Sequence, residues 1–221
     1  MHKYILPVNK AFEQHANTEN AAGAKAYLLN QFEFFGLKTP LRDFITKAHI
    51  KQAQLLDISE AEAIVKDLWS LPQREYQYFA IDVFAAHKKL WKTSSLRLME
   101  YCITHKSWWD SVDGIASDWT GPFFKLFPEK IPVTKRWNES KNMWLQRSSI
   151  MFQKAYRNNT NTALLSSYIL NCSGSKEFFI QKAIGWALRE YSKTNPDWVK
   201  KFVADNKLAP LSKREALKRI V

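Results

Sequence analysis

Two segments of the chain, Trp144-Leu145-Gln146-Arg147 and Phe179-Ile180-Gln181-Lys182, lie 35 residues apart and match in residue type at each position. The same step, carried along the chain, gives a series in which three of five residues are aromatic: Arg74, Trp109, Trp144, Phe179 and Arg214. Three residues before the middle three members stand lysines: Lys106, Lys141 and Lys176. A period near 35 is the length of a helical hairpin, so each position predicts the start of a helix.

The period predicts an all-α protein, because about six such hairpins stacked side by side form a helical solenoid. Glycine is scarce, with 6 residues in 221, which disfavours turn-rich β folds. No long linker or low-complexity segment interrupts the chain, so we expect a single domain over residues 1–221. The second helix of each hairpin would line the concave side and bring the lysines and Arg147 to one groove.

Capping and helix-breaking residues predict where individual helices begin and end. Residues 21–35 are helical in composition and stop at Gly36, and Thr39-Pro40 restarts a helix with threonine as the N-cap. Four further signals follow: a capping box at Ser59–Glu62, a helix from Pro72 to about Lys89, an N-cap at Ser107, and a break at Gly121-Pro122.

The charge of the chain is concentrated in its C-terminal part. The formal net charge is +12, and residues 131–221 contribute 17 Lys and Arg against 6 Asp and Glu. A one-sided basic surface suits a polyanion such as nucleic acid, since neutralised phosphates release counterions. A basic surface without a specific partner is the alternative reading of the same charge.

Other sequence features narrow the class of protein. Cys102 and Cys172 stand alone and the histidines show no ligand spacing, so we expect neither a disulfide framework nor a metal or other cofactor. The first seven residues, Met1 to Pro7, contain too short an apolar run for a signal peptide. No stretch of the chain approaches the roughly 20 apolar residues of a membrane span. A reducing cytoplasm and no membrane partner are the expectation.

One group of residues can carry chemistry. Trp109 and Asp113 stand at i and i+4 on one helix face. One period after Asp113 comes Arg147, in nearly the same register, and Trp186 follows a further period on. In stacked hairpins these four residues would form a cluster of two indoles, a carboxylate and a guanidinium facing a basic groove. By residue type alone, the tryptophans are more often core and an aspartate in a first helical turn is more often surface.

Several segments together resemble the AlkD-type DNA alkylation-repair glycosylases. These segments span nearly the whole chain and are residues 35–40, 69–75, 106–113, 144–147, 175–191 and 208–216. They include the runs Lys-Ser-Trp-Trp-Asp-Ser-Val-Asp and Phe-Phe-Ile-Gln-Lys-Ala-Ile-Gly-Trp, which are too rich in tryptophan and too long for coincidence.

The resemblance implies a right-handed α-solenoid of about six HEAT-like helical hairpins, with a basic concave face that wraps double-stranded DNA. It implies a monomeric, monofunctional glycosylase that removes positively charged N3- and N7-alkylated purines and so initiates base excision repair. The catalytic aspartate of the family matches Asp113, its two sugar-contacting tryptophans match Trp109 and Trp186, and its active-site arginine matches Arg147.

The DNA-contacting residues come partly from the resemblance and partly from the register. Tyr27 matches a tyrosine that contacts the DNA backbone near the lesion. The full expected set is Tyr27, Lys38, Thr39, Arg42, Lys106, Lys141, Lys176, Lys182, Arg189, Lys213 and Arg214. One departure is visible after Arg42, where the family pattern favours a second basic residue and this chain has Asp43. One phosphate contact is thereby placed in doubt.

The residue types fit the implied reaction. An alkylated purine cation is already a good leaving group, so no general acid is needed. Positive charge develops on the deoxyribose, where a carboxylate stabilises it and orients water, and indole faces add attraction. Two other functions stay open at this stage: a catalytically silent helical-repeat protein that binds damaged or branched DNA, and a scaffold for protein partners.

Overall fold

The computed structural model describes residues 2–220 and divides into two compact units, residues up to Leu98 and residues from Met99. Met1 and Val221, the two ends of the predicted single domain, lie outside the described residues. The described chain is all-helical, with one isolated bridge between Glu33 and Gln73 as its sole β pairing. The all-α prediction is confirmed, and the single domain stays a prediction, since each unit is described by itself.

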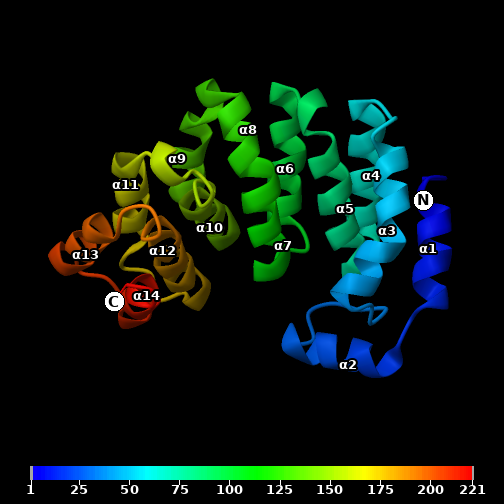
Figure 1. The fold of residues 1–221 in the computed structure, drawn as a ribbon, viewed down its shortest axis with the longest axis horizontal. Helices are drawn as coiled ribbons and strands as arrows, with labels where there is room; N and C mark the ends of the chain where they lie inside the picture. Colours follow the sequence, from blue (N-terminus) through cyan, green and yellow to red (C-terminus); the bar gives the residue numbers. More distant parts are fainter. Residues whose placement is uncertain (1, 221) are drawn as a thin grey trace. The chain divides into compact units, whose positions relative to one another are not determined.

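Unit 1, the N-terminal unit, is built mainly from five α-helices (Figure 1). They are α1 (Ile5–Gln14), α2 (Thr18–Tyr27), α3 (Thr39–Ala53), α4 (Ile58–Ser70) and α5 (Arg74–Ala86), followed by the 3₁₀ turns η1 (Lys88–Leu90) and η2 (Thr93–Ser95). α3 and α4 pack against α5, and Phe12 of α1 contacts Tyr76 and Phe79 of α5 in an aromatic cluster. The division between the units falls within α6 (Leu96–Thr104).

Unit 2, the C-terminal unit, contains the elements that follow α6 (Figure 1). They are α7 (Trp109–Gly114), the π-helix η3 (Ile115–Thr120), α8 (Gly121–Leu126), η4 (Pro128–Lys130), α9 (Pro132–Asn138), α10 (Met143–Met151), η5 (Arg157–Asn159), α11 (Thr162–Cys172), α12 (Phe178–Tyr191), α13 (Pro196–Asp205) and α14 (Pro210–Leu217). α10 packs against α7, α9, α11 and α12, and α12 packs against α14. Helices about one period apart in sequence are therefore neighbours in this unit.

The 35-residue register predicts helix starts accurately over most of its length. The helices expected at positions 74, 109, 144 and 179 begin at Arg74, Trp109, Met143 and Phe178. The last position is wrong by four residues, because α14 already begins at Pro210, a residue whose fixed φ favours the first turn of a helix.

The helix predicted over residues 21–35 is wrong in its second half. α2 ends at Tyr27, and Leu29 and Asn30 adopt left-handed backbone with φ of 55° and 57°. The end of α2 is closed locally, since the backbone N–H of Asn30 donates to the Lys25 carbonyl. Farther on, the buried carboxylate of Glu75 accepts hydrogen bonds from the backbone N–H groups of the three residues from Phe35 to Leu37, which holds this stretch in a non-helical course.

The break predicted at Gly121-Pro122 is also wrong. The chain continues from α7 through the π-helix η3 into α8, and Gly121 keeps helical φ and ψ. Pro122 lacks an N–H and its ring would clash with a carbonyl of a regular α-helix, so a wider turn directly before it is a physical solution. Glycine is required at 121, because a Cβ there would lie 2.8 Å from the carbonyl oxygen of Phe152.

Four helix starts are shifted from their predicted caps. Lys38, not Thr39, is the N-cap of α3. Asp57, not Ser59, caps α4 by accepting from the backbone N–H of Glu60. The Ser107 hydroxyl donates to the Ile103 carbonyl instead of capping α7, whose N-cap is Trp108. The start predicted at Pro72 falls two residues later, at Arg74. At the starts of α4 and α7, local carboxylate and hydroxyl groups within a few residues decide the boundary.

Candidate active site

Asp113 and Arg147 form the central pair of the site. Nε and Nη2 of Arg147 each donate to one carboxylate oxygen of Asp113, and both distances are 2.7 Å. The Arg147 side chain is 1% exposed, whereas 14% of the Asp113 side chain remains accessible. The geometry is a two-bond fork between guanidinium and carboxylate, which fixes the plane as well as the position of the carboxylate.

Three helices meet at this pair. Asp113 lies one turn after the start of α7, and Arg147 lies in α10, whose N-cap Asn142 accepts from two backbone N–H groups. The remaining Nη1 of Arg147 donates to the backbone carbonyl of Phe179 at the start of α12. The guanidinium therefore ties α7, α10 and α12 together, and the helical period explains why residues so far apart in sequence converge.

Trp186 lies beside the pair and is surrounded by cationic side chains. The Arg147 guanidinium carbon is 5.6 Å from the centre of the Trp186 ring, that of Arg189 is 5.5 Å, and the Lys182 nitrogen is 6.0 Å away. Its indole N–H is buried and has no hydrogen-bond partner within residues 2–220. The ring is thus held by cation–π contacts and keeps an unused donor. Trp109, half-buried, opens α7 one turn before Asp113.

A second carboxylate, Glu215 of α14, holds two of these cations. Lys182 donates to one of its oxygens at 2.9 Å and Arg189 to the other at 2.9 Å. The hydrogen bond from Lys182, together with the charges of Lys182 and Arg189, lowers the pKa of Glu215. Close packing of α12 on α14 makes the arrangement possible, since a Cβ on Gly185 would lie 2.5 Å from the Cβ of Glu215. Sequence reasoning missed Glu215, because no local pattern marks its partners.

Two other tryptophans, Trp108 and Trp144, have a packing role. Trp108, Trp144 and Phe179 form a three-ring cluster with centroids 5.1–5.8 Å apart, at the starts of α7, α10 and α12. Trp144 and Phe179, two aromatic members of the 35-residue series, therefore pack together with Trp108, and packing is the role expected for Trp108 and Trp144.

The predicted phosphate-contacting lysines of unit 2 sit just before helix starts. Lys106, Lys141 and Lys176 precede the N-caps of α7, α10 and α12 by one or two residues. Helix N-termini carry partial positive charge, so cations there reinforce a field that attracts phosphates. Lys213 and Arg214 lie on α14 and are half-buried and exposed, respectively.

The predicted DNA-contacting residues of unit 1 gather around the start of α3. Tyr27 ends α2 and is 71% exposed, while Lys38 is the N-cap of α3 and Thr39 its first residue. Lys38, Thr39 and Arg42 line a hollow of about 450 Å³. Asp43, the departure from the family pattern, accepts a hydrogen bond of 3.0 Å from the Arg42 guanidinium. Asp43 therefore takes the place of a positive charge on this surface, and its carboxylate also engages one nitrogen of the Arg42 guanidinium.

The loop that leads into α3 is shaped by Glu75, a residue that sequence reasoning did not single out. Glu75 is buried and accepts from the backbone N–H groups of Phe35, Gly36 and Leu37 at 2.9–3.1 Å. Gly36 has φ of +83°, and a Cβ there would lie 2.1 Å from the carbonyl oxygen of Asn17. The carboxylate thus fixes the backbone that presents Lys38.

Within residues 2–220, no group of three or more His, Cys, Asp or Glu side chains is arranged to hold a metal ion. The helices of this same range are all too short or too polar to cross a membrane.

Together, the fold and the site define a class of protein: an all-helical protein that holds a carboxylate in a fixed position on a basic surface. The model of the DNA alkylation repair enzyme family matches residues 8–220, and the chain belongs to this family. A solved structure described as a predicted DNA alkylation repair enzyme from Enterococcus faecalis is 32% identical, with a TM-score of 0.88 over 93% of this chain and 97% of that one. Family membership supports an enzyme that acts in the repair of alkylated DNA.

A second solved structure, that of smu.31 from Streptococcus mutans UA159, shares the fold. It is 20% identical, with a TM-score of 0.62 over 81% of this chain and 95% of that chain. A comparison with curated proteins found no match.

Proposed function

We propose that this enzyme is a monofunctional DNA glycosylase. It hydrolyses the N-glycosidic bond of positively charged N3- and N7-alkylated purines, such as 3-methyladenine and 7-methylguanine, in duplex DNA and so initiates base excision repair. The observation that carries the proposal is the Asp113 carboxylate, held by two 2.7 Å hydrogen bonds from Arg147 and still partly open to solvent.

The pair supplies what the departure of a cationic base requires. The cationic base takes the electron pair of the breaking glycosidic bond and leaves as a neutral molecule, so no group has to protonate it, and the positive charge passes to the deoxyribose. A carboxylate about 4 Å from that charge stabilises it by up to about 4 kcal/mol at an effective dielectric constant near 20. Each Asp113 oxygen accepts one bond from Arg147 and keeps lone-pair capacity to orient the attacking water.

The surrounding residues support binding in this proposal. Trp109 and Trp186 face the deoxyribose, where their indole rings favour a developing cation. The lysines before α7, α10 and α12, together with Lys182, Arg189, Lys213 and Arg214, contact backbone phosphates, and Tyr27, Lys38, Thr39 and Arg42 do the same from unit 1. We further propose a monomeric right-handed solenoid of HEAT-like hairpins that is cytoplasmic and nucleoid-associated when bound.

Release of 7-methylguanine or 3-methyladenine from methylated duplex DNA by the purified full chain tests the proposal. We expect multiple turnovers of free base and an intact sugar–phosphate backbone with an abasic site. Salt-sensitive DNA binding without base release would instead indicate a silent binding protein, and no salt-sensitive binding at all would indicate a protein scaffold.

A further inference from the structure

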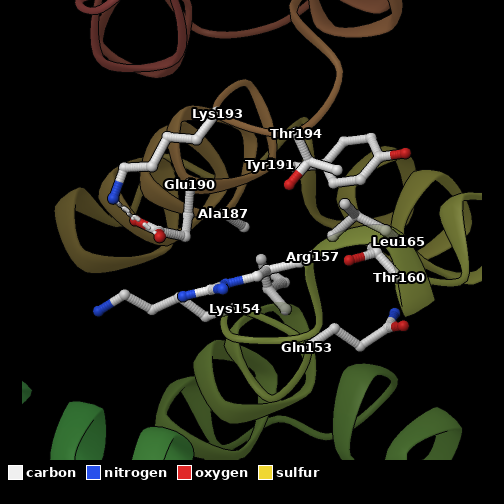
Figure 2. A pocket seen from close by; sticks show the side chains of 11 residues that line it. Gln153, Lys154, Arg157, Thr160, Leu165, Ala187, Glu190, Tyr191, Lys193 and Thr194 are labelled. Atoms are coloured by element: carbon white, nitrogen blue, oxygen red, sulfur yellow. Dashed lines mark hydrogen bonds and ion pairs between the residues drawn. The ribbon is translucent and has the colours of Figure 1, made fainter.

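A pocket of about 360 Å³ lies in unit 2, lined by residues of α10, α11 and α12, of the segment between α10 and α11, and of the segment that follows α12. Its volume is in the range of small-molecule sites. The charged side chains of its wall gather on one side, as Figure 2 shows: Lys154, Arg157, Glu190 and Lys193. None of these residues belongs to the candidate active site, so the pocket is a separate feature of the molecule.

The segment that forms one wall is held in shape. Gln153 is buried, its side-chain oxygen accepts from the backbone N–H of Asn161 at 2.8 Å, and its amide donates to the Asn161 carbonyl at 3.3 Å. Asn161 in turn caps α11. Arg157 lies within this closed loop with φ of 52°, a left-handed conformation that costs free energy for a residue with a side chain. The wall is therefore preformed, and the loop backbone is set by more than local preference.

The pocket carries uncompensated positive charge. Both Glu190 oxygens accept from Lys193, at 2.6 and 2.8 Å, so this pair is neutral. Within residues 2–220, no carboxylate lies within ion-pair distance of Lys154 or Arg157, and Asp118 acts on Lys154 only through its longer-range charge. Lys154 and Lys193 follow the ends of α10 and α12, and Arg157 lies in η5, so none of the three lies in the last turn of either helix.

The remaining walls define the kind of molecule that would fit. Hydroxyl groups of Thr160 and Thr194 line the pocket, and Ile150, Leu165 and Ala187 provide apolar surface. A guanidinium beside an ammonium matches the oxygens of a phosphate group. The apolar surface suits the carbon part of the same molecule.

We propose that this pocket binds a phosphate group, supplied either by a small phosphomonoester or by a DNA backbone. Lys154 and Arg157 bind the phosphate oxygens from one side of the pocket, and the hydroxyls of Thr160 and Thr194, on the other side, contact the rest of the ligand. The proposal is independent of glycosylase activity, because it rests on residues that the proposed reaction does not use.

The test compares a pocket variant with a charge-matched control in the full chain. The pocket variant is Lys154→Ala with Arg157→Asn, since asparagine tolerates left-handed backbone. The control is Arg136→Ala with Lys207→Ala, which changes two exposed basic residues outside the pocket and outside the predicted DNA-contacting set. Both variants lose two positive charges. Calorimetric titration with inorganic phosphate and deoxyadenosine 5′-monophosphate, and anisotropy with unmodified duplex DNA, give the affinities.

We expect the pocket variant to bind at least about tenfold more weakly than the control, because charge-assisted hydrogen bonds are lost. Weakening toward the mononucleotide or phosphate identifies a free phosphomonoester as the ligand, and weakening toward duplex DNA alone identifies the backbone. Equal affinities of the pocket variant and the control for all three probes would overturn the proposal. Base release at saturating methylated DNA, measured in parallel, reports on the proposed function separately.

Discussion

Each unit of the molecule holds a carboxylate largely removed from water, and the two are held differently. Glu75 in unit 1 is 1% exposed and accepts from three consecutive backbone N–H groups. Asp113 in unit 2 accepts from a single side chain, Arg147, and 14% of it remains exposed. Glu75 is engaged in fixing a loop, whereas Asp113 is oriented and still accessible. The partners of a carboxylate, more than its burial, separate a structural role from a chemical one.

Glu215 is an intermediate case. It is nearly as buried as Glu75, but its partners are the side chains of Lys182 and Arg189, which are themselves predicted DNA contacts. We infer that Glu215 orients cations and takes no part in bond breaking.

The largest effect is expected at Arg147. Arg147→Met leaves the Asp113 carboxylate without its partner and removes the side-chain donor to the Phe179 carbonyl, so the free energy of unfolding should fall by about 3–5 kcal/mol. Urea denaturation measures the change. The control variant Arg136→Met, at an exposed arginine, should change the free energy of unfolding by no more than about 0.5 kcal/mol. A loss at Arg147 as small as that of the control would show that the pair does not organise unit 2.

Glu75→Gln should come next and should affect stability without affecting chemistry. The amide keeps one acceptor but turns a donor toward backbone N–H groups, so we expect unfolding to become easier by about 1–3 kcal/mol. Base release by the folded variant at saturating DNA should equal that of the wild type, and the exposed-residue control is Glu60→Gln. A folded Glu75→Gln protein that no longer releases base would break the distinction between the two carboxylates.

Asp43→Asn should strengthen DNA binding through unit 1. The variant removes a negative charge and frees the Arg42 guanidinium from its 3.0 Å partner. One additional phosphate contact should raise affinity severalfold at low salt and steepen the plot of log K against log salt by about 0.9. Fluorescence anisotropy at several salt concentrations gives this slope. An unchanged slope would remove Arg42 from the set of phosphate contacts.

The smallest effect concerns Glu215 and pH. Its pKa is lowered in the folded protein by the hydrogen bond from Lys182, so its contribution to stability is present above the unfolded value of about 4.3 and is lost as pH falls through the folded value. The stability difference between wild type and Glu215→Gln should therefore stay constant from pH 7 to about pH 5 and shrink on further acidification to about pH 3. Thermal melts across this range measure it. A difference independent of pH would contradict an ionised, paired Glu215.

Features that depend on local sequence and on the period were predictable. The starts of α5, α7, α10 and α12 follow from the aromatic register, and the meeting of Asp113 with Arg147 follows from stacking at that period. Features set by distant partners were not predictable. The non-helical course of residues 35–37 depends on Glu75, some 40 residues away, and nothing near Glu215 indicates that Lys182 and Arg189 bind it.

The pairing of Arg42 with Asp43 shows the same limit at short range. The sequence showed a missing positive charge, but whether Asp43 would face solvent or its neighbour depends on side-chain rotamers. The continuous helix through Gly121-Pro122 likewise depends on a π turn that a sequence pattern does not reveal.

The central claim, that Asp113 performs chemistry, is tested most directly by base release from methylated duplex DNA with Asp113→Asn and Asp110→Asn side by side. Both variants make the same chemical change, three residues apart on α7, and both are assayed well below their melting temperatures. The account predicts that Asp113→Asn loses on the order of a hundredfold or more in rate at saturating DNA, while Asp110→Asn stays close to wild type. Full base release by folded Asp113→Asn would contradict it.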